Sequence, residues 1–245
     1  MRDRAYILTE IAAVSALAWL YLIRMPMSPA DFGSLAERIA APLPSPVIDF
    51  TICFLMWAVM MVAMMLPSAS PMILTYAKLA GPREGASFLW TWAFTAGYLA
   101  VWTAYSVAAT AAQMALARAA ILTNAMTVAP LLGAAILAAA GIYQFTPWKS
   151  ACLKHCQSPM GFFMTRWRDG AAGAFKMGLQ HGASCVGCCW MLMILLFVAG
   201  VMNLTWVAAI TIFVLLEKIV PYPRAVSFTA GCALIASSAM IILIH

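Results

Sequence analysis

Long apolar segments separated by short polar ones cover almost the whole chain. The apolar segments are residues 5–23, 47–79, 87–117, 125–145, 171–200, 204–219 and 226–244. A helix of about 20 apolar residues is long enough to cross the hydrocarbon core of a bilayer. The pattern therefore predicts an all-α fold: a polytopic transmembrane helical bundle of about seven spans that forms a single domain over residues 1–245.

The composition supports a membrane protein. Of the 245 residues, 65% are hydrophobic and 9% are charged, whereas charged residues make up about a quarter of a typical soluble domain. The net charge is +6, but the basic residues form no run that would bind nucleic acid. We therefore expect the lipid bilayer as a partner and no nucleic acid.

The chain divides into three parts on this pattern. Residues 1–46 hold an anchor helix and a proline-rich external loop, with one interfacial helix at 34–41. No small-residue cleavage site follows the first helix, so we interpret it as an uncleaved anchor. Residues 47–220 form the core that carries the candidate metal ligands, and residues 221–245 hold the last span.

The distribution of basic residues predicts the orientation of the bundle. With seven spans and a cytoplasmic N-terminus, only Arg24, Arg38 and Arg118 of the 14 Lys and Arg residues lie outside. Basic residues concentrate on the cytoplasmic side of membrane proteins, so we expect a multi-pass protein of a bacterial inner (plasma) membrane. In this topology residues 60–68 and 181–188 both lie in the cytoplasmic half of the membrane.

One face of the predicted fifth span carries a stripe of soft metal ligands. The stripe consists of Met177, His181, Cys185 and Cys188. At about 100° per residue these four fall within about 80° of arc, and Cys189 lies about 100° from the last of them. An ionisable residue at membrane depth tends to mark function. Cys and Met are also common core residues, so simple packing is the alternative.

A methionine-rich segment in the second predicted span supplies further soft ligands. Its clustered thioethers are Met60, Met61, Met64 and Met65. Pro67 and Pro71 are expected to kink this helix and to free backbone carbonyl groups. We expect the second span to pack against the fifth, where Gly178 and Gly182 permit close approach. A flexible methionine seam against another helix is the structural alternative.

Residues 146–170 are predicted to form a polar loop between the fourth and fifth spans. The loop contains Cys152, His155 and Cys156, at a spacing too compressed for a standard zinc finger. A solvated basic loop is the simplest interpretation. The alternative is that the loop covers the cytoplasmic mouth of the bundle and exchanges a metal ion there.

Several other polar residues are interpreted as structural. Tyr98 lies in an aromatic-rich span and is expected to pack against neighbouring helices or the interface. Gln144 ends the fourth span and is expected to form interface hydrogen bonds. Glu217 and Lys218 point in different directions on a helix, so we expect one of them to face the protein. Cys232, in the last span, is expected to be a packing residue.

Three motifs taken together resemble one protein family. They are MWAVMMVAMMLPS, YQFTPWKSACLKHC and GLQHGASCVGCCWMLM, in that order. With them the chain resembles, over residues 47–218, a bacterial family of integral membrane proteins of unassigned function that is described as predicted metal-binding. The resemblance implies a metal but no reaction. The positions that it carries over are Met60, Met61, Met64, Met65, Pro67, Cys152, Cys156, His181, Cys185, Cys188 and Cys189.

The ligand types favour a copper-handling membrane protein. Thiolate and thioether ligands select Cu(I), and zinc stays as a second choice. The expected copper ligands are Met64, His181, Cys185 and Cys188, with metal exchange through Cys152 and Cys156. The expected role is transport, delivery or cofactor assembly, with a metallochaperone or another membrane subunit as partner.

Other functions stay open at this point. A membrane thiol oxidoreductase would cycle Cys185 and Cys188 between dithiol and disulfide, although a continuous helix holds their Cα atoms at an unfavourable distance. Haem is less favoured because the sequence has no CxxCH motif and offers only His181 as an intramembrane axial ligand. A structural subunit of a larger complex is a further alternative. No Ser/His/Asp set, paired carboxylates or phosphate-binding glycine loop indicates a hydrolytic enzyme.

Overall fold

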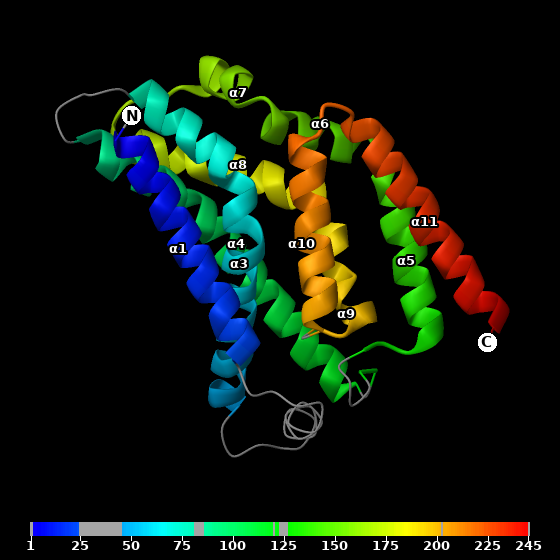
Figure 1. Cartoon of the computed structure of the whole chain (residues 1–245). Coiled ribbons are helices and arrows are strands. Elements are labelled where there is room, and N and C mark those ends of the chain that lie inside the picture. Colours follow the sequence, from blue (N-terminus) through cyan, green and yellow to red (C-terminus); the bar gives the residue numbers. More distant parts are fainter. Residues whose placement is uncertain are drawn as a thin grey trace.

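The fold is helical throughout the described part of the chain (Figure 1). The computed structural model describes residues 2–24, 46–80, 86–119, 121–122, 127–201 and 203–244. The helices are α1 (Arg2–Arg24), α3 (Pro46–Ala80), α4 (Ala86–Arg118), α5 (Pro130–Gln144), α6 (Pro147–Gln157), α7 (Pro159–Arg166), α8 (Gly170–Ile194), α9 (Leu196–Ala199), α10 (Leu204–Ile219) and α11 (Pro223–Ile244). These residues contain no strand, so the all-α prediction is confirmed for them. Residues 25–45, with the predicted interfacial helix, lie outside the described part.

Several helices have the length and apolar character needed to cross a membrane. Among the described residues these are Ala5–Arg24, Val47–Ala80, Phe88–Arg118, Gly170–Ala199 and Pro223–Ile244. The pair α5 and α6 would add a sixth span if it is counted as one segment bent by 64°. The helix α10 has 16 residues, fewer than the roughly 20 that a straight span needs. A bundle of five or six spans is therefore supported, and the seventh span and the orientation stay predictions.

The helices pack in a chain of neighbours that ends at the candidate site. The helix α8 packs mainly against α4, α4 packs against α3, and α3 packs against α1. The helix α10 lies against α3, while α5 and α11 form a pair at the opposite side of the molecule from α1 (Figure 1). The short helix α6 connects this pair to the rest by packing on α8.

Glycine residues set the close contact between α4 and α8. A Cβ atom at Gly97 would clash with the carbonyl oxygen of Phe175, and one at Gly178 would clash with that of Phe94. At Gly182 a Cβ atom would lie 2.9 Å from the Cβ of Val101. The glycines of the fifth predicted span thus bring it against the third, whereas they were expected to bring it against the second.

The helix α3 continues through both of its prolines because other groups take over the freed backbone acceptors. Pro67 has no N–H to bond the carbonyl of Ala63, and the indole N–H of Trp19 donates to that oxygen at 3.2 Å. Pro71 likewise frees the carbonyl of Pro67, which accepts from the hydroxyl of Ser70 at 2.8 Å. The long helix therefore passes uninterrupted from Pro46 to Ala80.

The segment predicted as a polar loop is helical. The helices α6 and α7 each begin at a proline that follows a hydroxyl residue, Thr146 before Pro147 and Ser158 before Pro159. Proline is well suited to the first turn of a helix, where its missing N–H costs nothing. The side chain of Thr146 also accepts a hydrogen bond from the backbone N–H of Lys149 at 3.3 Å. The loop prediction is wrong because the Thr-Pro and Ser-Pro pairs start two helices within this segment.

Candidate metal centre

Three cysteine side chains from two helices meet inside the protein. The sulfur atoms of Cys156 on α6 and of Cys185 and Cys188 on α8 all lie within 4.8 Å of one another. All three residues are buried, with Cys185 fully so. We call these three residues the thiol triad. Two of its members were predicted as core ligands, whereas Cys156 was predicted to lie in an exchange loop.

The helix α6 approaches α8 closely enough to contribute Cys156 because a glycine lies at the contact. A Cβ atom at Gly187 would lie 2.7 Å from the sulfur of Cys152. Cys152 and Cys156 are four residues apart and therefore share one face of α6. Cys152 is half-buried, whereas Cys156 is buried in the triad. Cys152 thus lies at the partly exposed edge of α6, and Cys156 lies one turn further into the interior.

A buried lysine lies beside the triad. The ammonium group of Lys218 donates hydrogen bonds to the sulfur of Cys185 at 3.1 Å and to the hydroxyl of Ser68 at 2.8 Å. Only 9% of the Lys218 surface is exposed, and within the described part of the chain no carboxylate pairs with it. A buried charge requires a compensating partner, and Cys185 can supply one in its thiolate form because its sulfur contacts this ammonium group.

A tyrosine completes the immediate surroundings of Cys185. The phenolic oxygen of Tyr98 lies 3.2 Å from the sulfur of Cys185 and 3.1 Å from the backbone carbonyl of Met65, to which it can donate. Tyr98 is fully buried, so its hydroxyl must find its partners inside the protein. Through this residue α4 links α3 to Cys185 of the triad.

Cys189 lies next to the triad, and its thiol contacts the side chains of Cys185 and Cys188. Its thiol donates to the carbonyl oxygen of Cys185 at 3.0 Å, and the thiol of Cys188 donates to the same oxygen at 3.1 Å. Cys189 is not a member of the group of mutually close ligand atoms. It therefore borders the candidate site, as the helical angle between Cys188 and Cys189 predicts.

His181 lies one turn before Cys185 and outside the triad. Its ring is surrounded by Tyr98, Phe94 and Phe162, at centroid distances of 5.3, 6.1 and 6.0 Å. The residue is buried, and neither ring nitrogen has a hydrogen-bond partner among the described residues. Aromatic rings therefore surround the imidazole ring, and the expected contact with methionines stays a prediction.

The methionine cluster lies in the core of α3. Its four members are Met60, Met61, Met64 and Met65, and each is at most 1% exposed. Met61 and Met64 precede Ser68 by seven and four residues and so share its face of the helix. Ser68 is the α3 residue that contacts Lys218. Met61 and Met64 therefore lie on the face of α3 that is directed at Lys218 and the triad. The triad itself consists of cysteines.

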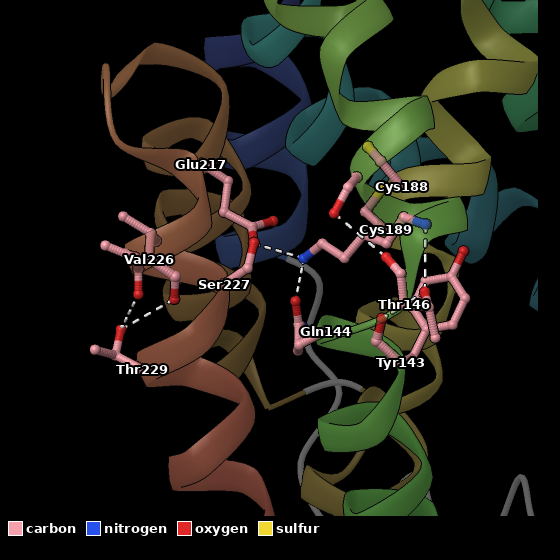
Figure 2. A network of polar contacts seen from close by, with 12 residues as sticks. Tyr143, Gln144, Thr146, Cys188, Cys189, Glu217, Val226, Ser227 and Thr229 are labelled. Carbon is pink, nitrogen blue, oxygen red and sulfur yellow. Dashed lines mark hydrogen bonds and ion pairs between the residues drawn. The ribbon is translucent and has the colours of Figure 1, made fainter.

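A second buried polar network adjoins the triad through α10. Lys149 on α6 forms an ion pair with Glu217 at 2.5 Å and donates to the side-chain oxygen of Gln144. Glu217 also accepts from the hydroxyl of Ser227 at 2.7 Å. Gln144, Glu217 and Ser227 converge from α5, α10 and α11 (Figure 2). One of Glu217 and Lys218 was expected to face the protein. In the structure both are buried.

The sequence interpretation missed Tyr98, Lys218 and Ser68 as members of the site. Lys218 carried a usable signal, because a lysine at the end of an apolar helix next to a glutamate needs a partner of its own if both are buried. Tyr98 gave no such signal, since a tyrosine in an aromatic-rich helix is ordinary packing. Cys232 was predicted to pack but is exposed.

The donor set of the triad fits a soft metal ion. Thiolates favour Cu(I) and zinc over hard cations. Three sulfur atoms around one ion at a bond length of about 2.3 Å stand about 4.0 Å apart. The mutual distances within 4.8 Å therefore need only small side-chain rotations to reach this geometry.

These observations define a class of protein: an all-helical chain with several membrane-length helices and a buried cysteine cluster suited to a soft metal ion. The chain belongs to the PpoB2 copper chaperone family, whose sequence profile matches residues 54–241. Copper handling therefore agrees with the metal that the thiol and thioether ligand types favoured. Comparisons with curated proteins and with solved structures gave no match.

Proposed function

We propose that the protein is an integral membrane copper chaperone that binds one Cu(I) ion through Cys156, Cys185 and Cys188. The observation that carries this proposal is the meeting of three buried cysteine sulfur atoms within 4.8 Å of one another, in a chain of the copper chaperone family. The finer topology belongs to the same proposal: seven spans in a bacterial inner membrane, with a cytoplasmic N-terminus.

The number and charge of the ligands favour Cu(I) over zinc. Structural zinc sites are almost always four-coordinate, and no fourth His, Cys, Asp or Glu of the described residues has its ligand atom within 4.8 Å of all three sulfur atoms. The ammonium group of Lys218 also repels a bound cation, and a divalent ion is repelled twice as strongly as a monovalent one. A three-thiolate site beside a fixed positive charge is therefore better matched to Cu(I).

The cysteines of α6 provide a route for the cargo. Cys152 is half-buried and lies one turn from Cys156, which belongs to the triad. An ion held first at Cys152 can pass to the triad by ligand exchange, without crossing the apolar core. A donor or acceptor protein, either a metallochaperone or another membrane subunit, would meet the chain at this edge of α6.

Competition with a chromophoric Cu(I) chelator such as bicinchoninate tests the proposal. The full chain in detergent should bind one Cu(I), and Cys156→Ser, Cys185→Ser and Cys188→Ser should each weaken binding about tenfold or more. Cys232→Ser is the matched control, because this exposed cysteine lies outside the triad, and it should bind as the wild type does. A Cu(I) affinity in the three triad variants equal to that of Cys232→Ser would refute the site.

The same preparations separate copper binding from thiol redox chemistry. A membrane thiol oxidoreductase would hold no copper, and its free-thiol count would fall by two on oxidation and recover on reduction. Under our proposal the free-thiol count falls on copper loading and recovers when the chelator removes the ion. An impermeant thiol reagent added to intact cells tests the topology, because Cys152 should be protected on the cytoplasmic side.

A further inference from the structure

A pocket of about 560 Å³ lies at the junction of α5, α6 and α11, apart from the thiol triad. Its lining combines two fixed positive side chains, Lys154 and Arg224, with two phenylalanines, Phe145 and Phe228. Gln144 also belongs to the lining. None of these residues belongs to the proposed copper site.

The basic residues of the pocket have no acidic partner in the part of the chain that the structure describes. Lys154 comes from α6 and Arg224 from the first turn of α11, and both are exposed. Within the described residues neither of them takes part in an ion pair. Ser227, which also lines the pocket, donates its hydroxyl hydrogen to Glu217, whose carboxylate is already paired with Lys149. The pocket therefore offers a net positive charge to a ligand.

The amide of Gln144 adds a buried donor without a partner. Lys149 donates to its side-chain oxygen, and this contact fixes which end of the amide is oxygen and which is nitrogen. The amide nitrogen is buried and has no hydrogen-bond partner among the described residues, in a residue that is 3% exposed. A buried N–H₂ group without an acceptor is costly, and an anionic oxygen atom in the pocket would supply one.

The apolar side of the pocket continues into surfaces suited to acyl chains. The rings of Phe145 and Phe228 meet edge to face at a centroid distance of 5.5 Å, and they are 44% and 60% exposed. Further along the same two helices, Ile142 on α5 and Leu243 on α11 are also exposed. A ligand with an anionic head and an apolar tail would match both parts at once.

We infer that this pocket binds the phosphate-bearing headgroup of an anionic phospholipid. Lys154 and Arg224 contact the phosphate group, the amide nitrogen of Gln144 donates to one of its oxygens, and the acyl chains lie over Phe145 and Phe228. Basic pockets between membrane helices are recognised sites for such headgroups. The inference does not depend on copper binding, because it rests on a different set of residues.

Native mass spectrometry of the full chain in a non-ionic detergent tests the inference with soluble probes. Dioctanoyl phosphatidylglycerol should bind one per chain, and dioctanoyl phosphatidylcholine should bind much more weakly. Inorganic phosphate and a hexaglutamate peptide are the competing probes. If inorganic phosphate displaces the lipid at similar concentration, the pocket is a free-anion site. If the peptide displaces it, the pocket is a protein-docking site. Either result overturns the inference.

Variants assign the binding to the pocket. The double variant Lys154→Gln/Arg224→Gln should bind the lipid roughly thirtyfold more weakly, from about fivefold for each basic residue. Lys78→Gln/Lys176→Gln removes the same charge from exposed positions elsewhere and should bind as the wild type does. Gln144→Glu keeps the acceptor for Lys149 and replaces the free donor by an anionic oxygen, so it should also weaken binding. Equal losses in the pocket variant and the control would refute the site.

Discussion

The ammonium nitrogen of Lys218 lies 3.1 Å from the sulfur of Cys185, and both residues are buried. Cys185 is also the member of the triad that Tyr98 contacts, at 3.2 Å. A cation and a hydroxyl group directed at one sulfur atom stabilise its thiolate form. A thiolate at Cys185 is able to bind a metal ion. The positive charge of Lys218 affects which ion the site prefers.

Replacing Lys218 should change the selectivity of the site. At a distance of about 5 Å and an effective dielectric constant of about 20, each unit of positive charge on the ion costs roughly 3 kcal/mol. Removing the ammonium group therefore reduces the electrostatic repulsion of Zn(II) more than that of Cu(I). We expect Lys218→Met to raise the affinity for Zn(II) relative to that for Cu(I) by about tenfold or more, measured by competition titrations with both ions.

The variant Lys218→Arg is the control for this prediction, because arginine keeps the positive charge. Its ratio of zinc to copper affinity should stay close to that of the wild type. A ratio that is unchanged in Lys218→Met would show that the charge does not select the ion. A ratio that shifts equally in both variants would show that the effect comes from packing.

Replacing His181 should stabilise the protein without loss of copper. Both ring nitrogens are buried without partners among the described residues, and each unpaired buried polar group costs about 1 to 3 kcal/mol. Phenylalanine fits among the aromatic rings of Phe94, Tyr98 and Phe162. We expect His181→Phe to raise the thermal unfolding midpoint and to change the Cu(I) affinity by less than about threefold.

His155→Phe is the control for the stability part of this prediction, since the side chain of His155 is exposed. Its unfolding midpoint should not change. A large loss of Cu(I) affinity in His181→Phe, with the fold intact, would identify the histidine as a ligand and extend the site beyond the triad.

The contributions of Lys149 and Glu217 to stability should depend on each other, because the two residues form a buried ion pair. Breaking a buried pair leaves one charge without compensation and costs about 3 to 5 kcal/mol. We expect Glu217→Gln and Lys149→Met each to lower the thermal unfolding midpoint of the full chain in detergent. The double variant should recover part of this loss, because it leaves no isolated charge. Additive losses in the double variant would show that the two residues do not depend on each other.

Much of the fold is visible in the hydrophobic pattern. Apolar runs of membrane length predicted the helices α1, α3, α4, α8 and α11. Such a run is recognisable because nearly all of its residues must be apolar over the whole thickness of the bilayer. The contacts between helices could not be predicted in the same way. Gly178 and Gly182 indicated a close helix neighbour, but nothing in their own segment says that the neighbour is α4 and not α3.

The site was predictable where its residues share one helix. Cys185 and Cys188 follow from the spacing along α8. Cys156 could be assigned to the triad only through the folding of α6 against α8, which depends on Gly187 and on the helix start at Thr146. Lys218 lies 33 residues beyond Cys185, and no local pattern relates the two.

X-ray absorption spectroscopy at the copper edge identifies the atoms that bind the copper ion directly. The Cu(I)-loaded full chain should show three sulfur neighbours at about 2.3 Å and no nitrogen shell. In Cys156→Ser the sulfur count should fall by one, because this residue brings the third thiolate from α6. A sulfur count that is the same in Cys156→Ser and the wild type, or a nitrogen shell in the wild type, would contradict a site made of Cys156, Cys185 and Cys188.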